Sequence, residues 1–283
     1  MAAYTNLGIA SGCLGNYEKA IEFHQQTLRI AKEIGDKRSE GKAYYILGTA
    51  YHCLSNYDKA IEFHQQSLRI AKEIRDKGTE GAAYTNLGAA YHCLGNYQKA
   101  IKFHQQSLSI AKDLRDESTE GTAYTNLGAA YHCLGNYEKA IEFHQQSLSV
   151  AKEIGDKGTE GTAYTNLGAA CTCLGNCKKA IKFHQQSLGV AKEIGKKRTE
   201  GTAYTNLGVA YHCLGNYEKA IEFHQQSLSI AKQIKDKGTG GTAYTNLGAA
   251  YRCLGNYEKA IKFHQQSLNV AKQIGDIQAQ LLV

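Results

Sequence analysis

The sequence predicts an all-α fold, an α-solenoid built from seven stacked helix–turn–helix repeats. Three observations predict it: a forty-residue unit recurs seven times without insertions, each unit carries two helical hydrophobic patterns, and proline is absent from all 283 residues. Copies this uniform must occupy nearly equivalent environments, and a linear stack supplies such environments for every copy except the two at the ends.

The repeating unit can be taken from residues 123–162. We expect one continuous solenoid domain over residues 1–276, followed by a C-terminal tail or capping stub over residues 277–283. In that stub, Leu281, Leu282 and Val283 are expected to cover the exposed end of the stack. The copies begin near equivalent alanines: Ala3, Ala43, Ala83, Ala123, Ala163, Ala203 and Ala243.

The first helix of the unit shows one apolar stripe. In the fourth copy, Tyr124, Leu127, Tyr131 and Leu134 recur at steps of three and four residues, which is the helical period. Gly128 lies beside this stripe in every copy, although glycine within a helix costs about 1 kcal/mol relative to alanine. Its retention indicates that a partner helix crosses too closely to leave room for a Cβ atom.

The second helix is expected over about residues 137–154, with apolar and small residues on two faces. A helix that is apolar on two faces is packed between neighbours, here its own first helix and the next repeat. The turn before it contains Gly135, which suits a left-handed C-cap. After it, Asp156 or Thr159 is expected to cap the following first helix.

Composition excludes several classes of protein. The formal net charge of +7 comes from scattered residues, so no basic block predicts binding to nucleic acid or a membrane surface. No signal peptide is recognisable, and no stretch approaches the roughly 20 apolar residues of a membrane span, so we expect a cytoplasmic protein.

The nine cysteines do not form a disulfide pattern, because seven of them are copies of one repeat position. We expect these to be small, buried, reduced residues. Only Cys171 and Cys177 depart from the pattern. The seven copies are Cys13, Cys53, Cys93, Cys133, Cys173, Cys213 and Cys253.

Several packing residues of the unit form a recognisable signature. They are Leu127, Gly128, Tyr131, Gly135, Tyr137, Ala140 and Phe143. This set resembles the signature of the tetratricopeptide repeat (TPR) family. The period of forty residues, against the usual ~34, and the missing helix-ending proline make the repeats similar to those of the Pins/LGN G-protein signalling modulators. The resemblance implies a right-handed superhelix whose first helices line a concave groove, and a protein-binding scaffold or adaptor.

One column of asparagines is the strongest candidate for ligand contact in that groove; Ile46 interrupts it. A side-chain amide offers two donors and one acceptor, so it can bind a peptide backbone without recognising its side chains. The alternative is that these amides cap or link neighbouring helices inside the stack. The predicted peptide contacts are Asn6, Asn86, Asn126, Asn166, Asn206 and Asn246, together with Thr85, Thr125, Thr165 and Thr205.

Two histidine columns recur. His52, His92, His132 and His212 are assigned to the groove, and each is followed by cysteine. Metal binding is not expected, because zinc ligands lie ~2.0–2.3 Å from one ion whereas stacked helices lie ~10 Å apart. The second column, which includes His24 and His264, is expected to be a hydrogen-bonded core position. No cofactor is predicted.

The inner face does not match the TPR group that clamps C-terminal carboxylates. Thr85, Ala89 and Thr125 stand where the resemblance would place Lys, Asn and Arg. Lys42 and Arg252 are the only basic residues assigned to this face. Binding of chaperone tails is therefore not expected.

The fifth copy is degenerate, because Cys171, Thr172 and Cys177 replace Tyr, His and Tyr. Loss of two rings predicts the softest point of the stack. The alternative is that Cys171 and Cys177, which flank the turn, form a redox pair or a metal clip.

No copy combines a nucleophile, a base and an orienting acid, so we do not expect an enzyme. The predicted function is a scaffold that binds an extended peptide or partner segment of unknown identity, as a monomer or with end-to-end self-association. A structural or self-assembling array without a groove ligand is the alternative. An engineered or recently duplicated array with no selected ligand is a third possibility.

Overall fold

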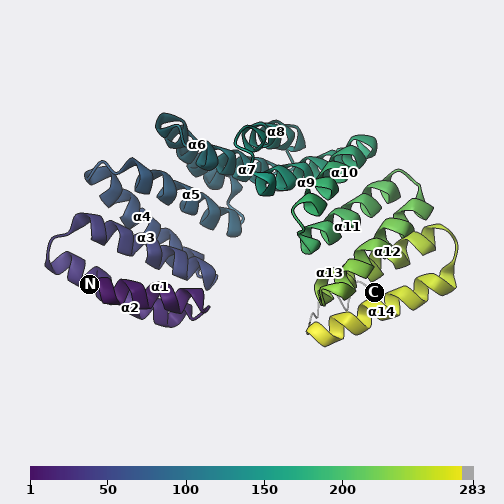
Figure 1. The fold of residues 1–283 in the computed structure, drawn as a ribbon, viewed down its shortest axis with the longest axis horizontal. Coiled ribbons are helices and arrows are strands. Elements are labelled where there is room, and N and C mark those ends of the chain that lie inside the picture. Colours follow the sequence, from purple (N-terminus) through teal and green to yellow (C-terminus); the bar gives the residue numbers. More distant parts are fainter. Residues whose placement is uncertain (276–283) are drawn as a thin grey trace. The chain divides into compact units, whose positions relative to one another are not determined.

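The protein is described by a computed structural model over residues 1–275. Within these residues the chain forms fourteen α-helices and no β-strand, which confirms the predicted all-α architecture of paired helices (Figure 1). The predicted capping stub, including Leu281, Leu282 and Val283, lies outside the described residues.

The chain separates into two compact units, and the boundary falls between Asn136 and Tyr137. The first unit contains α1 (Ala2–Cys13), α2 (Tyr17–Glu33), α3 (Lys37–Cys53), α4 (Tyr57–Glu73), α5 (Lys77–Cys93), α6 (Tyr97–Leu114) and α7 (Glu117–Cys133). The second unit contains α8 (Tyr137–Glu153), α9 (Lys157–Cys173), α10 (Cys177–Glu193), α11 (Lys197–Cys213), α12 (Tyr217–Gln233), α13 (Lys237–Cys253) and α14 (Tyr257–Ile274). The single solenoid domain over residues 1–276 stays a prediction.

The helices begin and end where local sequence signals place them. Gly135, at the end of α7, has φ of 75°, the left-handed conformation predicted for this turn. The second helix α8 begins at Tyr137, as expected. Before α9, Asp156 is the N-cap and accepts from the Thr159 amide at 3.0 Å, which resolves the choice between the two candidates in favour of aspartate.

Asparagine in the turn caps most of the second helices. The Asn96 side chain, for example, accepts a hydrogen bond from the Lys99 amide at 3.2 Å and so satisfies one of the free N–H groups of the first turn of α6. The same bond is formed before α2, α4, α12 and α14. Asn176, before α10, forms no such bond.

The core repeats with the sequence. In most pairs a leucine and two alanines of the first helix are almost completely buried, for example Leu87, Ala83 and Ala90 on α5. The conserved spacing of this apolar stripe explains why copies with different turn residues still form the same pair. The fully buried leucines are Leu47, Leu87, Leu127, Leu167, Leu207 and Leu247.

The buried histidine column explains the mid-helix glycine. A Cβ atom added to Gly48 would lie 2.6 Å from Cε1 of His64, so the imidazole occupies the space of the missing side chain. The glycine therefore permits a close approach, as predicted, although its partner is a histidine side chain of the second helix. His24, His64, His104, His144, His184 and His224 are buried core residues as predicted, whereas His264 is only half-buried.

The expected hydrogen bonding is not found at Nδ1 of four rings of this column. Nδ1 of His64, His104, His184 and His224 has no protein partner within residues 1–275. Burial lowers the pKa of each of these four imidazoles to about 4, because desolvation disfavours the charged form. The prediction of a core position was correct, and that of a hydrogen-bonded one was wrong for these four rings at Nδ1, because the facing glycine offers only packing.

Successive first helices contact one another from α3 to α7 in the first unit and from α9 to α13 in the second. Among the described residues, successive second helices of a unit are not in comparable contact. The first helices therefore form the inner, more closely spaced layer of each unit. We call the side of this layer that faces away from the second helices the inner face.

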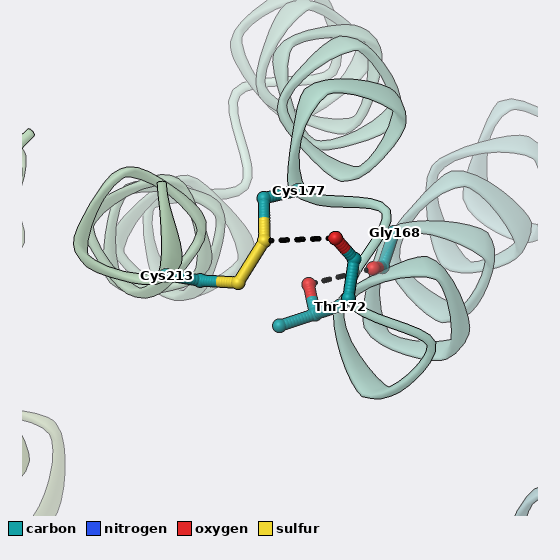
Figure 2. The surroundings of a disulfide bond; sticks show 5 residues. Gly168, Thr172, Cys177 and Cys213 are labelled. Carbon is teal, nitrogen blue, oxygen red and sulfur yellow. Dashed lines mark hydrogen bonds between the residues drawn. A yellow bond between two sulfur atoms is a disulfide. The ribbon is translucent and has the colours of Figure 1, made fainter. Parts of the chain in front are cut away.

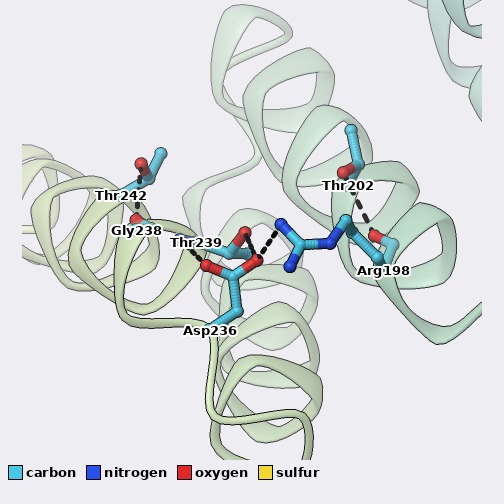
Figure 3. A network of polar contacts seen from close by, with 6 residues as sticks. All are labelled: Arg198, Thr202, Asp236, Gly238, Thr239 and Thr242. Atoms are coloured by element: carbon cyan, nitrogen blue, oxygen red, sulfur yellow. Dashed lines mark hydrogen bonds and ion pairs between the residues drawn. The ribbon is translucent and has the colours of Figure 1, made fainter. Parts of the chain in front are cut away.

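Polar contacts also link successive repeats. Figure 3 shows Arg198 at the start of α11 reaching Asp236, with a separation of 2.8 Å between the guanidinium and Oδ2. Asp236 is also the N-cap of α13 and accepts from both the amide and the hydroxyl of Thr239. The Asp236 carboxylate therefore has two roles: it pairs with Arg198 of the preceding first helix, and it caps the N-terminus of α13.

Candidate binding surface on the first helices

The helical period determines which predicted residues share the inner face. At 100° per residue, positions four and seven apart lie on nearly the same side of a helix. On α5 this places Ala82, Asn86, Ala89 and Cys93 together. Thr85, one residue before Asn86, points about 100° away and toward the second helix.

All but the first asparagine of the column are half-buried. Asn126, Asn166, Asn206 and Asn246 form no hydrogen bond within residues 1–275, although each is partly shielded from solvent. Asn86 makes a long contact of 3.5 Å from its Nδ2 to Oγ1 of Thr49. These amides therefore do not cap helices, and only Asn86 links neighbouring first helices. Asn6, on α1, is exposed.

The threonine hydroxyls are engaged inside the repeat. Thr85 Oγ1 donates to the carbonyl oxygen of Gly81 at 3.1 Å and lies 2.7 Å from Oγ of Ser107 on α6. The same pair of contacts is made by Thr165 and by Thr205 in the second unit. Thr125 donates to the carbonyl of Gly121. The structure thus places these hydroxyls between helices, and not beside the asparagine amides.

The predicted groove histidines lie at the end of the first helices, half-buried against an aromatic ring. The ring centroids of His92 and Tyr97 are 5.2 Å apart in an edge-on arrangement, and those of His52 and Tyr57 are equally close. His212 makes the same contact with Tyr217 at 5.1 Å. His132 is also half-buried, and burial lowers its pKa.

The repeated cysteines are exposed, so the prediction that they are buried was wrong, and the prediction that they are reduced was wrong for Cys213, which forms a disulfide. Each stands in the last turn of a first helix, where no helix covers it. Cys93 Sγ lies 3.8 Å from Nε2 of His52 in the preceding repeat, and Cys133 lies 3.6 Å from His92. The histidine and cysteine columns therefore meet across repeats, which the sequence did not reveal because adjacent residues of one helix diverge.

A disulfide links the fifth copy to the sixth, between Cys177 at the start of α10 and Cys213 at the end of α11 (Figure 2). Their Cα atoms are 6.2 Å apart, within the range for disulfides. The predicted alternative of a Cys171–Cys177 pair was wrong, because Cys171 is free and buried. The other copies explain this pairing, because they have tyrosine at the position of Cys177. In the first copy this residue is Tyr17, and its hydrogen bond with Cys53 of the next repeat raises the pKa of Tyr17. Cys53 is the equivalent of Cys213, so a cysteine at the tyrosine position lies beside a cysteine of the next repeat.

Three cavities follow one another along the first helices of the first unit. The middle one, of about 380 Å³, is lined by Lys42, Tyr45, Ile46, Gly78, Thr79 and Ala82. A neighbour of about 240 Å³ shares Tyr45 and Ala82 and includes Asn86. A third, of about 160 Å³, shares Lys42 and Ile46. The sequence signal for the middle cavity is Ile46, the residue of the second copy that interrupts the asparagine column.

The described part of the chain offers no cluster of three or more His, Cys, Asp or Glu side chains suited to hold a metal ion. Among residues 1–275 there is also no helix whose length and hydropathy would allow it to cross a membrane.

The comparisons with known proteins establish the family. A family model described as tetratricopeptide repeat matches six overlapping segments that together span residues 1–273, and the chain therefore belongs to the TPR family. The segments are residues 1–73, 39–113, 79–153, 119–193, 159–233 and 199–273. No curated protein matches the sequence.

Solved structures share the fold. A signal transduction ATPase with numerous domains (STAND) protein with a tetratricopeptide repeat sensor, from Pyrococcus horikoshii, is similar with a TM-score of 0.82 and 24% identity over 99% of this chain. The match covers 44% of that protein. The apo form of RapI has a TM-score of 0.78 at 13% identity, with 97% of this chain and 98% of that chain covered. The apo quorum sensor NprR from B. thuringiensis has a TM-score of 0.73 at 18% identity, over 93% and 74% of the two chains.

Proposed function

We propose that this TPR protein is a non-enzymatic scaffold that binds an extended peptide segment of a partner along the inner face of its first helices. The observation that carries the proposal is the set of half-buried asparagine amides with no hydrogen-bond partner: Asn126 in the first unit, and Asn166, Asn206 and Asn246 in the second. A polar group that is partly desolvated and left without a partner favours a ligand that supplies one.

The spacing of the repeats suits a peptide backbone. Packed helices lie about 8–10 Å apart, and three residues of an extended chain advance about 10 Å. Successive asparagine amides within a unit would therefore contact peptide groups that lie three residues apart, each donating to a carbonyl and accepting from an N–H. The threonine hydroxyls are already bonded and are not part of this contact. The histidines would lie at the edge of the bound segment.

Two finer points are parts of the same proposal. The forty-residue, proline-free repeat supports an adaptor role like that of the Pins/LGN modulators. Seven of the nine cysteines are free thiols, which supports a reducing compartment such as the cytoplasm, and the Cys177–Cys213 disulfide is the exception. Two of the similar structures are sensors, the STAND protein with its tetratricopeptide repeat sensor and the quorum sensor NprR, which also fits a binding role.

The test is selection of peptides from a displayed random library on the full chain, followed by titration of the selected synthetic peptides. A variant carrying Asn86→Ala, Asn126→Ala, Asn166→Ala and Asn206→Ala should bind them at least about tenfold more weakly, a loss of about 1.4 kcal/mol. Asn269→Ala, at an exposed position of α14, is the matched control and should bind like the wild type. Equal affinities for the wild type and the fourfold variant would refute the asparagine contact.

One observation favours end-to-end self-association as a second candidate. Leu7 on α1 and Ile261 on α14 are 49% and 59% exposed, whereas their equivalents Leu47 and Ile221 are buried. Inside the second unit Ile221 packs against Leu247 of the next repeat, so Ile261 of one molecule could pack against Leu7 of another in the same way.

Light scattering coupled to size exclusion tests this second candidate. Self-association predicts a mass that rises with protein concentration and falls for Ile261→Glu. A concentration-independent monomer would exclude it and would leave the peptide-binding proposal unaffected.

A further inference from the structure

The copies of the first helix differ at few inner positions, and four of those differences gather at one repeat junction. Position 45 is tyrosine only in the second copy, since the other six copies have threonine there. Position 46 is isoleucine only in the second copy, where the others have asparagine. Lys42 is likewise unique, and Ala82 in the third copy replaces the threonine of the last four copies.

All four departures line the same cavity. The middle cavity of the first unit, about 380 Å³, has Lys42, Tyr45 and Ile46 on its α3 side and Ala82 on its α5 side. Its volume lies within the roughly 300–1,000 Å³ typical of binding pockets. The copies are otherwise nearly identical, so four residues that differ from the repeat and line one cavity form a site that the other repeat junctions lack.

The shape and lining of the cavity suit a bulky apolar side chain. Ile46 presents an apolar side chain where every other copy presents an amide. The Tyr45 ring is half-buried and edge-on to the His64 ring at 5.8 Å, which fixes its position. On the opposite side, Gly78 has no side chain and Ala82 only a methyl group, so the space that a threonine would occupy is open.

The mouth of the cavity carries an unpaired positive charge. Lys42 is exposed and has no carboxylate within ion-pair distance in the described part of the chain. The hydrogen bonds from Thr79 contribute most to lowering the pKa of Asp76, and the charges of Arg38 and Lys42 add to the effect, so two cations lie near this one carboxylate. An acidic group of a ligand would therefore be attracted to Lys42.

We infer that this cavity is a specificity pocket that takes a leucine- or phenylalanine-sized side chain of the bound peptide, with an acidic peptide residue paired to Lys42. The inference rests on the proposed function, because it assigns side-chain recognition to the peptide held by the asparagine amides. The adjoining cavity shares Tyr45 and Ala82 and reaches Asn86, so a peptide leaving the pocket in that direction meets the first amide.

The experiment uses four synthetic twelve-residue peptides in a neutral Gln/Ser/Ala host. The first peptide carries phenylalanine and, two residues away, aspartate. The second replaces phenylalanine by alanine, the third replaces aspartate by lysine, and the fourth makes both changes. Affinities are measured for the full wild-type chain and for a reverted variant with Lys42→Thr, Tyr45→Thr, Ile46→Asn and Ala82→Thr. Because these replacements are the residues of the other copies, the reverted variant should fold like them, and circular dichroism confirms it.

The wild type should bind the Phe/Asp peptide about tenfold or more tightly than each of the other three, and the reverted variant should bind all four alike. If the wild type binds all four peptides equally, or the reverted variant keeps the preference, the pocket is refuted while peptide binding stands. If neither protein binds any of the four peptides nor any library-selected peptide, the proposed function itself fails and the pocket with it.

Discussion

The helix pairs α5–α6 and α9–α10 have the same architecture but different chemistry at their turns. In α5–α6, Tyr91 stacks on Phe103 at 5.4 Å, and the Lys99 ammonium lies 4.9 Å from the centre of the tyrosine ring. In α9–α10, Cys171 and Lys179 stand at the equivalent positions and neither contact exists. A disulfide from Cys177 to the next first helix is present instead.

The shared parts of the two pairs are the buried leucine, the glycine and the histidine. Leu87 and Leu167 are both fully buried, and His104 and His184 are buried against glycine in both pairs. The comparison teaches that the leucine–glycine–histidine core determines the fold of a pair. The turn residues determine only which contacts link the pair to its neighbour.

The largest expected effect tests the shared core. Leu87→Ala and Leu167→Ala should each destabilise the protein by about 2–5 kcal/mol, because each removes a fully buried side chain and leaves a cavity. Denaturant unfolding of the two variants should give similar losses. A loss for Leu167→Ala below half that for Leu87→Ala would show that the degenerate pair is not held by the common core.

The next effect tests the disulfide that links α10 to α11. Reduction of the Cys177–Cys213 disulfide, or Cys177→Ser, should cost about 2–4 kcal/mol, because the bond closes a loop of 36 residues. Cys93→Ser, which removes a free thiol, is the matched control and should change stability little. Thermal unfolding with and without a dithiol reductant measures both. An unchanged midpoint on reduction would mean that the disulfide does not stabilise the second unit.

Glycine substitutions separate close packing from helix propensity within one helix pair. Gly168→Ala should destabilise by about 1–3 kcal/mol, because its Cβ would collide with the His184 ring. Gly189→Ala, on α10, meets nothing within 4 Å and should stabilise the protein by about 0.5–1 kcal/mol. If both variants shift the unfolding midpoint in the same direction, the account of the glycine column is incorrect.

Acidification should affect both pairs alike. An unfolded histidine binds a proton below about pH 6.5, whereas buried His104 and His184 do so only near pH 4, so the unfolded state holds more protons between these values. Stability is therefore full above pH 6.5 and falls as the pH drops toward 4, by about 1 kcal/mol per buried histidine at pH 5.5. Urea unfolding between pH 7.5 and 5 measures the slope.

The control for the pH dependence is a substitution on the same pair that removes no titrating group. His104→Asn should reduce the slope of stability against pH, even if it lowers stability overall, whereas Gln105→Asn, at an exposed position of α6, should leave the slope unchanged. Stability that is independent of pH across this window would contradict the burial of neutral imidazoles.

The smallest effect concerns the helix caps. Asn96→Ala should cost about 1 kcal/mol, because its side chain accepts from the Lys99 amide. Asn176→Ala should cost nearly nothing, since Asn176 forms no cap bond. Equal costs at the two positions would show that the turns before α6 and α10 are equivalent after all.

Features that depend on local periodicity could be predicted from the sequence. The start of α8 at Tyr137, the left-handed Gly135 and the buried Leu127 follow from helical spacing and turn chemistry. The glycine column was also predicted as a close approach, because no other reason keeps glycine within a helix.

Features that depend on the register between repeats could not be predicted. Cys177 meets Cys213, and His52 meets Cys93, only because the end of one first helix lies beside the turn of the preceding repeat. The middle cavity of the first unit could not be predicted for the same reason. Ile46 and Ala82 are visible as departures in the sequence, yet their shared lining depends on how α3 and α5 are offset.

The central claim is that the inner-face asparagine amides bind a peptide backbone, and side-chain amide NMR tests it most directly. On titration with a library-selected peptide, the resonances of Asn126, Asn166, Asn206 and Asn246 should shift and their hydrogen exchange should slow. The cap residues Asn96 and Asn216 should remain unchanged, since their amides already serve the helix ends. Saturation of the protein with peptide while all four inner-face resonances stay in place would contradict the account.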